Sequence, residues 1–167
     1  MQALDEGEII EAELGGDTWL CSWHGPGAMP EGTPHGAGGM CVTPEGEVVL
    51  VTGDRVRWDA PAGRPEPGET SEETLRREVS EEACVRVVSA RLLGFSRGAC
   101  IRGDEAGLIL VRSLWRAEVE VLPWQPRFET TARRIETQSE AWRILKDANP
   151  FTAALYRRWF EEAGLRD

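Results

Sequence analysis

The sequence lacks the features that mark membrane, secreted and zinc-binding proteins. No apolar run approaches the roughly 18 residues that a membrane span needs, and the N-terminal MQALDEGEIIEAEL is acidic, without the apolar core of a signal peptide. The four cysteines show no C-x-x-C spacing, which argues against a zinc site or a disulfide framework. We therefore expect a cytoplasmic protein with reduced thiols and no membrane partner.

Positive charge and histidine are also scarce. The 19 Lys and Arg residues stand against 29 Asp and Glu, which leaves a net charge of −10. Binding to a long nucleic acid needs basic patches, so we expect no such partner. A small phosphorylated substrate stays open, because bound metal and a few arginines can reverse the local field. The two histidines, His24 and His35, flank a Gly/Pro-rich loop. A surface role is the simple interpretation, and a substrate contact is the alternative.

Length and composition indicate one globular domain over residues 1–167, since 41% of the chain is hydrophobic and 29% charged. Apolar and alternating runs predict strands over 8–14, 17–23, 37–43, 47–53, 85–95 and 108–121, and short strands near 56–58 and 133–137. The segments 24–36 and 96–107 are predicted loops, so residues 1–36 form an extension of two strands and a loop.

Three helices are predicted from capping signals and apolar spacing. Thr70 with Glu73 has the spacing of a capping box and starts a helix at about 71–83. Thr137 and Glu140 repeat the spacing for a helix at 138–147, within a C-terminal helical region over 138–167. Asn149 and Pro150 mark the start of the last helix, on which Phe151, Leu155 and Trp159 stripe one face.

The stretch from 63 to 85, GRPEPGETSEETLRREVSEEACV, carries the strongest chemical signal. Glu78, Glu81 and Glu82 share one face of the predicted helix, where each like-charge pair a turn apart costs about 0.2–0.5 kcal/mol. The helix dipole also disfavours negative charge near this end. A hard divalent cation would relieve the repulsion, because magnesium is held by carboxylates and substrate phosphates. A solvated acidic face is the alternative.

The spacing of this stretch resembles the signature of the Nudix hydrolases. The family pattern is Gly-x5-Glu-x7-Arg-Glu-aliphatic-x-Glu-Glu-x-Gly-aliphatic, and it matches here from Gly63 through Glu69 and Arg77 to Val85. One position departs, because Cys84 stands where the family has its second glycine. A left-handed helix end costs a non-glycine residue about 1 kcal/mol or more. Either the helix ends differently here, or the fold carries the strain.

The resemblance implies an α/β fold, a Nudix-like α/β/α sandwich around a mixed, curved sheet. It implies a metal-dependent hydrolase that cleaves the diphosphate linkage of a nucleoside diphosphate joined to another moiety. The expected cofactor is Mg2+, with Mn2+ as an alternative. The substrate is a small nucleotide-type molecule: a nucleotide sugar, ADP-ribose, a dinucleotide or a nucleoside triphosphate.

Matching positions imply the roles of individual residues. The implied metal ligands are the Gly63 carbonyl, Glu78, Glu81 and Glu82. Arg77 is implied to orient Glu69 and the glutamates through ion pairs, and Glu69 to tie the loop to the helix. The general base comes either from the helix, where Glu81 is a candidate, or from a downstream loop. We favour Glu129, with Asp104 and Glu105 as the other downstream candidates.

Substrate contacts and assembly are less constrained. Arg64 and Trp58 are the candidate substrate-binding residues, and Trp124 and Phe128 are further aromatic side chains for stacking, with core or rim packing as the alternative. A nucleotide-binding sensor without turnover is the main rival function, and an isomerase or a decapping-type enzyme on the same scaffold is another. A two-fold homodimer is the commonest homo-oligomer, and the N-terminal strands are the segment available for its contact.

Overall fold

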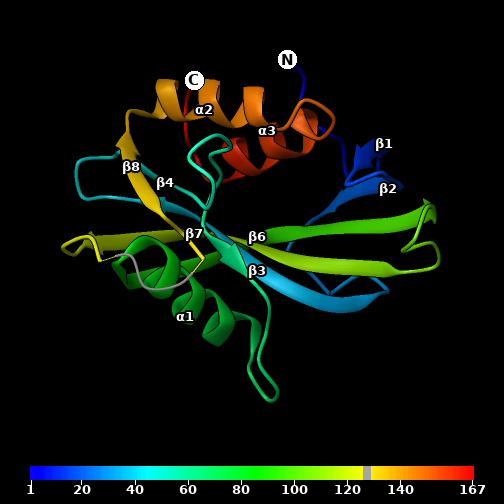
Figure 1. Ribbon diagram of the computed structural model, residues 1–167, viewed down its shortest axis with the longest axis horizontal. Helices are drawn as coiled ribbons and strands as arrows, with labels where there is room; N and C mark the ends of the chain where they lie inside the picture. The colour runs from blue at the N-terminus through cyan, green and yellow to red at the C-terminus, as the bar shows by residue number, and fades with distance from the viewer. Residues whose placement is uncertain (126–128) are drawn as a thin grey trace.

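The computed structural model describes residues 1–125 and 129–167 (Figure 1). Its helices and strands follow in the order β1 (Ile9–Leu14), β2 (Asp17–His24), β3 (Thr33–Val42), β4 (Val48–Thr52), β5 (Ala62–Gly63), α1 (Ser71–Ala83), β6 (Val85–Arg102), β7 (Ile109–Val121), β8 (Ala132–Glu136), α2 (Gln138–Ala148) and α3 (Ala153–Glu162). None of the helices in the described parts is long and apolar enough to cross a membrane.

The strands form one mixed sheet in the order β1-β2-β6-β7-β3-β4-β8, with β5 paired to β3. The central pair, β3 and β7, is parallel, and its neighbours are antiparallel. This pairing sets Gly36 beside Arg112, and the short β5 lies on the other side of β3 with Gly63 opposite Ala37. The loop that precedes α1 is thereby fixed at the centre of the sheet.

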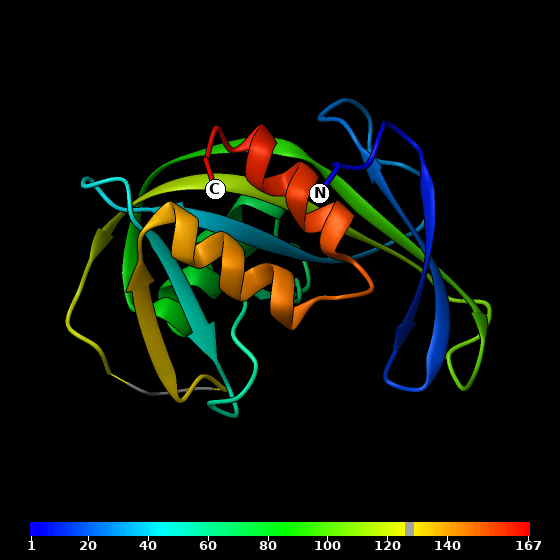
Figure 2. The ribbon, with the colours of Figure 1, turned by 90° about the horizontal axis from the view of Figure 1, so that it is seen from above.

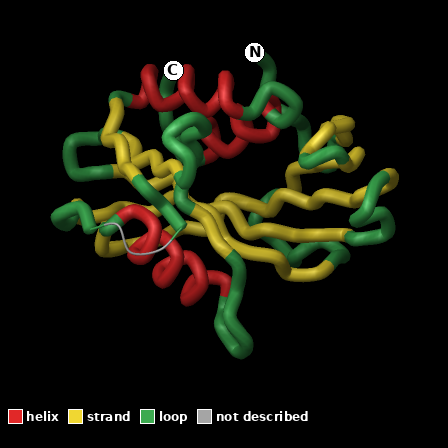
Figure 3. The backbone as a smooth tube through the Cα atoms, in the orientation of Figure 1, coloured by secondary structure: helices red, strands yellow, loops and turns green. Residues whose placement is uncertain are grey.

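Helices cover both faces of the sheet, so the molecule has three layers (Figures 1 and 3). Strand β4 alternates between them: Val49 and Val51 pack in the core under α1, and Val48 and Leu50 in the core under α2 and α3. In Figure 2 both C-terminal helices lie over the same face. The predicted α/β/α sandwich with a mixed sheet is confirmed.

Local sequence signals positioned α1 and α2 correctly. Thr70 caps α1 and accepts a hydrogen bond from the Glu73 amide at 3.2 Å, and Thr137 caps α2 with the Glu140 amide at 3.3 Å. The predicted apolar stripe of α1 is buried. The helix ends at Cys84 in the left-handed conformation, with φ 53° and ψ 54°. The fold therefore carries the strain of a non-glycine residue there.

Two predicted loops belong partly to strands. Residues 33–36 lie in β3 and residues 96–102 in β6, although both stretches are rich in glycine and polar residues. Pairing with β7 accounts for both, since this strand borders β3 on one side and β6 on the other. A register shift between Pro34 and Gly36 accommodates the proline, which cannot donate to the ladder. The prediction of loops at these positions was wrong because tertiary pairing outweighed local propensity.

Two further predictions are corrected. The expected strand at 56–58 is absent: Asp54 Oδ1 accepts hydrogen bonds from the amides of Val56 and Arg57 and holds the chain in a turn. The last helix begins at Ala153, because the Asn149 side chain donates to the Leu145 carbonyl at the end of α2. Phe151 therefore precedes the helix and is exposed.

Candidate active site

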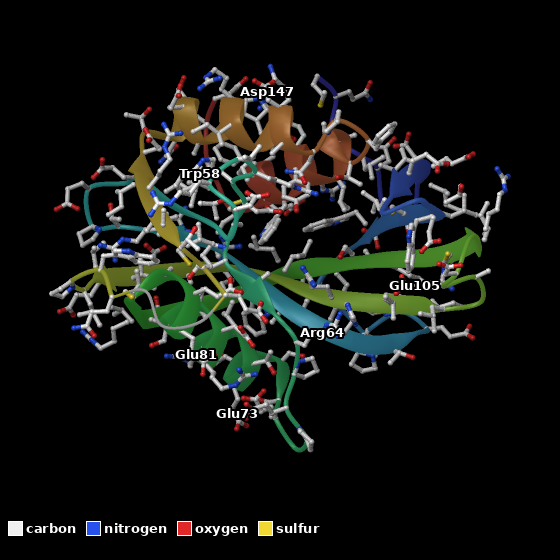
Figure 4. The ribbon with its side chains drawn as sticks, in the orientation of Figure 1. Trp58, Arg64, Glu73, Glu81, Glu105 and Asp147 are labelled. Atoms are coloured by element: carbon white, nitrogen blue, oxygen red, sulfur yellow. The ribbon has the colours of Figure 1, made fainter. Side chains whose placement is uncertain are left out.

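The residues of the signature meet at one cavity of about 500 Å³, which we call the carboxylate cavity. Its lining consists of Ala62, Gly63, Arg64, Glu78, Glu81, Glu82, Arg112 and Glu129. Arg64 lies on the chain leaving β5, and Glu81 on α1 (Figure 4). Three glutamates at i, i+3 and i+4 face the cavity because these positions share one side of a helix.

Gly63 is required by the close approach of α1. A Cβ atom at this position would lie 2.0 Å from the carboxyl carbon of Glu78 and 2.2 Å from its Oε2. Any side chain at position 63 would therefore displace this carboxylate. The contact brings the backbone of the loop and the first glutamate of the cluster to the same point.

Arg77 joins the loop to the helix. Its guanidinium binds both oxygens of Glu69, at 2.7 and 2.9 Å, and donates to the carbonyl of Arg64 at 2.9 Å. It also contacts Glu78 at 2.8 Å and Glu81 at 3.4 Å. The hydrogen bonds from Arg77 hold the pKa of Glu69 at about 2 and raise the pKa of Arg77 itself. The predicted ion pairs are thus present, and the positioning role of Arg77 stays a prediction.

Burial disfavours the ionised form of two glutamates. Desolvation raises the pKa of Glu82 to about 7, although the Ala62 amide donates to its Oε2 at 3.1 Å. Desolvation also raises the pKa of Glu78, and its ion pair with Arg77 offsets part of the shift. Two desolvated carboxylates on one cavity wall form a site where a cation would be stabilised.

The donor set fits a hard divalent cation. Carboxylate oxygens and a backbone carbonyl are the ligands that Mg2+ prefers, and the approach of Glu78 to Gly63 supplies both at one place. Within residues 1–125 and 129–167, no three His, Cys, Asp or Glu side chains are already grouped as metal ligands. Glu78 is turned to Arg77 and Glu82 to the Ala62 amide. Metal binding would therefore require these carboxylates to exchange protein partners for the ion.

Downstream candidates are separated by the fold. Glu129 lines the carboxylate cavity together with the glutamates of α1. Glu105 lies in the turn between β6 and β7, away from Glu81 (Figure 4), and Asp104 lies in the same turn. The structure thus brings one of the three downstream carboxylates to the site.

The predicted aromatic contacts lie elsewhere. Trp58 packs under the guanidinium of Arg134 at 5.4 Å and borders a separate hollow with Asp147 of α2 (Figure 4). Trp124 packs under Arg133 at 5.5 Å. Neither is among the residues that line the carboxylate cavity. Phe128 lies outside the described residues.

A second cavity of about 260 Å³, the aromatic cavity, opens on the other side of Ala62 and Arg112. Its walls come mainly from β2, β3, β6, β7, α3 and the segment before β5, and include Trp19, His35, Asp59, Tyr156 and Trp159. A third hollow of about 380 Å³, the bridging cavity, shares Asp59 with the aromatic cavity and Glu82 with the carboxylate cavity. The three form one continuous cleft, because each shares lining residues with the others.

Sequence reasoning missed most of the aromatic cavity. His35 was retained as an alternative substrate contact, and it does line the wall. Asp59 accepts hydrogen bonds from the Ala60 amide at 2.8 Å and the Tyr156 hydroxyl at 3.2 Å, and desolvation raises its pKa. Arg112 left one signal, since it interrupts the apolar run from Leu108 to Trp115.

Comparison with known proteins agrees with this arrangement. The family model described as NUDIX domain matches residues 33–132. The Bacillus subtilis pyrophosphohydrolase BsRppH superposes with a TM-score of 0.70 at 23% identity, over 92% of this chain and 95% of that one. A MutT structure, from work on Aliivibrio salmonicida and Vibrio cholerae, gives 0.55 at 15% identity, over 76% and 95%.

The family match spans the helix with its glutamates, the loop before it and the central strands of the sheet. It covers more than half of the chain, and the structural likeness to BsRppH covers 92% of it. The resemblance noted in the signature is confirmed: the chain belongs to the NUDIX domain family and is a Nudix-type hydrolase.

Proposed function

We propose that the protein is a divalent-metal-dependent pyrophosphohydrolase that cleaves the diphosphate linkage of a small nucleotide-type substrate. The observation that carries the proposal is the meeting of Glu78, Glu81, Glu82 and Glu129 with the Gly63 backbone on one cavity. The structurally similar protein from B. subtilis is named a pyrophosphohydrolase, which is in keeping with this proposal. Mg2+ is the proposed cofactor, with Mn2+ as an alternative.

The oxygen ligands at this site suit the hydrolysis of a diphosphate, because they can bind a divalent cation. Its oxygens carry several negative charges, which repel a water nucleophile. A bound divalent cation neutralises such oxygens and lowers the pKa of a coordinated water. In this chain Glu78, Glu81, Glu82 and the Gly63 carbonyl would hold the ion. Positioning and electrostatic stabilisation then supply most of the rate enhancement.

The remaining residues position the loop, accept a proton or contact the substrate. Arg77, bound to both oxygens of Glu69, keeps the loop against α1 and so fixes Gly63 relative to Glu78. Glu129 lines the same cavity, and we assign it the role of proton acceptor for the attacking water. Glu81 is the alternative base on α1. Arg64 lines the same cavity and is the proposed substrate contact there.

The test is turnover of a substrate panel with Mg2+ or Mn2+. The panel holds ADP-ribose, sugar nucleotides, dinucleoside polyphosphates and nucleoside triphosphates. Glu81→Gln and Glu82→Gln should fold normally, since glutamine preserves size and the acceptor for the Ala62 amide, and both should lose metal-dependent turnover. Glu72→Gln is the matched control: it removes the same charge from the exposed first turn of α1 and should cleave at the wild-type rate.

The outcomes separate the two function classes. Cleavage of one substrate class, lost in Glu82→Gln and kept in Glu72→Gln, supports the enzyme and identifies its substrates. Wild-type rates in both cavity variants would overturn the metal-site assignment. Metal-dependent nucleotide binding without any turnover across the panel would instead support a sensor module.

A further inference from the structure

Arg112 lies at the junction of the cleft. Together with Ala62 it lines the carboxylate, bridging and aromatic cavities, and no other charged residue in the described parts of the chain lines all three. It comes from the first half of β7, a strand paired on both sides. Its Cα position is therefore fixed by the sheet.

Two glycines let the side chain of Arg112 approach the loop before α1. Arg112 is the parallel partner of Gly36, and a Cβ atom at Gly36 would lie 3.3 Å from Arg112 Nε and 2.3 Å from the Gly63 carbonyl oxygen. The same Gly63 contacts Glu78 on its other side. The guanidinium stem thus passes beside the backbone that borders the carboxylate cavity.

The side chain of Arg112 has no protein partner in the parts of the chain that the structure describes. It forms neither a hydrogen bond nor an ion pair there, in contrast to Arg77, which binds Glu69, Glu78 and Glu81. Its charge acts at longer range on Glu82 and Asp59, one on each side of it. A half-buried cation without a partner is costly, so this arrangement suits a site that an anion completes.

We propose that Arg112 binds a phosphate group of the substrate and holds it between the carboxylate cavity and the aromatic cavity. The inference rests on the proposed function and adds the residue that recognises the substrate's charge. The planar guanidinium presents N–H donors in a fork that matches phosphate oxygens. The anhydride next to this phosphate then faces the glutamates of α1. The organic group on the other side faces Trp19, Tyr156 and Trp159.

Binding of a non-hydrolysable diphosphate tests the inference without any turnover. The probe is methylenediphosphonate with Mg2+, titrated calorimetrically into the full-length protein and into Arg112→Met, Arg112→Lys and Arg91→Met. Arg91 is the matched control, because it is exposed on the neighbouring strand β6 and is not among the residues lining the cleft. Loss of a charge-assisted hydrogen bond should weaken the affinity of Arg112→Met for the probe by roughly 10- to 100-fold.

The lysine variant keeps the charge and loses the fork, so its affinity should fall between those of wild type and Arg112→Met. Arg91→Met should bind as the wild type does. Without ligand, Arg112→Met should melt close to the wild-type temperature, because the removed side chain forms no hydrogen bond or ion pair in the described residues and its charge acts on Glu82 and Asp59 only at longer range. A structural arginine would lower the melting temperature instead.

Three results would overturn the inference: equal affinity in Arg112→Met, an equal loss in Arg91→Met, or no binding of the probe by the wild type. They differ from failure of the proposed function, which is read from turnover in Glu82→Gln. Unchanged probe affinity in Arg112→Met with turnover abolished in Glu82→Gln would refute the phosphate contact and leave the hydrolase proposal standing.

Discussion

The carboxylate cavity and the aromatic cavity share Ala62 and Arg112 and differ in almost everything else. The first is lined mainly by residues within one stretch, from Ala62 to Glu82, and the second by residues spread from Leu14 to Trp159. The carboxylate cavity holds glutamates of which two, Glu78 and Glu81, form ion pairs with Arg77. The aromatic cavity is lined by the rings of Trp19 from β2 and of Tyr156 and Trp159 from α3. The proposed chemistry is thus built locally, and the proposed recognition is built by long-range packing.

Two acidic side chains, one beside each cavity, have pKa values shifted in opposite directions. Glu69 beside the carboxylate cavity has its pKa held at about 2 by hydrogen bonds from Arg77. Asp59 beside the aromatic cavity has its pKa raised by desolvation, against weaker effects of the Ala60 amide and Arg57. Ionisation stabilises the fold at one end of the cleft and costs stability at the other.

Outside the residues that line the carboxylate cavity, the largest effect on turnover is expected at Arg77. Arg77→Lys keeps the charge and loses the bidentate contact with Glu69, so the loop carrying Gly63 is no longer held against α1. Groups that orient metal ligands typically contribute 10- to 100-fold, and we expect kcat/KM with the best panel substrate to fall by about that factor. The measurement is steady-state turnover with Mg2+.

Arg76→Lys is the matched control for this prediction. Arg76 is the neighbouring residue on α1, and its carboxylate partner is the partly exposed Glu72. Its substitution should leave turnover unchanged. An Arg77→Lys enzyme as active as Arg76→Lys would show that the ion pairs around Arg77 do not position the site.

The contrast between the two cavities also explains what the sequence could predict. The signature, the caps at Thr70 and Thr137, and the apolar stripe of α1 are local patterns, and the structure contains them as expected. The strand at residues 96–102 was missed because its pairing with β2 depends on residues far away in the chain. Periodicity cannot report such pairing.

The same reasoning applies to the site. Five cavity-lining residues of the signature stretch were named from this stretch and its resemblance to the family pattern: Gly63, Arg64, Glu78, Glu81 and Glu82. Arg112 and Tyr156 were not, since nothing local marks a strand arginine or a helix tyrosine as facing a cavity. Asp59 was not identified either. Its burial depends on contact with Tyr156, 97 residues away.

The pH dependence of stability should have opposite signs at Glu69 and Asp59. The folded-state pKa of Glu69 lies below its ordinary 4.5, so its ionised form stabilises the fold above pH 4.5 and this contribution is lost as the pH falls toward 2. Glu69→Gln should therefore be less stable than wild type at neutral pH, and the difference should vanish near pH 2.

Asp59 should show the reverse. Its folded-state pKa lies above 3.8, so the native protein binds more protons than the unfolded chain, and the cost of ionising Asp59 grows as the pH rises above 3.8. Asp59→Asn cannot ionise and can still pair with the Ala60 amide and Tyr156, so it should gain stability relative to wild type with rising pH. Urea unfolding of wild type and both variants from pH 3 to 8 measures how the stability of each variant relative to wild type changes with pH. Slopes of equal sign would contradict the contrast.

The smallest effect is expected at Cys84, where the chain departs from the family pattern. Its left-handed conformation costs a non-glycine residue about 1–2 kcal/mol, and glycine gives back about 0.5–1 kcal/mol through unfolded-state entropy. The backbone change in Cys84→Gly should thus add roughly 0.5 kcal/mol to the free energy of unfolding, before the loss of the thiol is counted.

Cys84→Ala separates the conformational term from the side-chain term. It keeps the positive φ and removes the thiol, which donates to the Gln125 carbonyl at 3.3 Å and accepts from its amide at 3.4 Å. The alanine variant should therefore be less stable than wild type in denaturant unfolding, and the glycine variant, which also loses the thiol but relieves the strain, should be more stable than the alanine variant. Turnover should be unchanged in both, because Cys84 is not among the residues lining the cleft. If alanine proved as stable as glycine, backbone strain at this helix end would be negligible, and the departure from the family's glycine would carry no energetic cost.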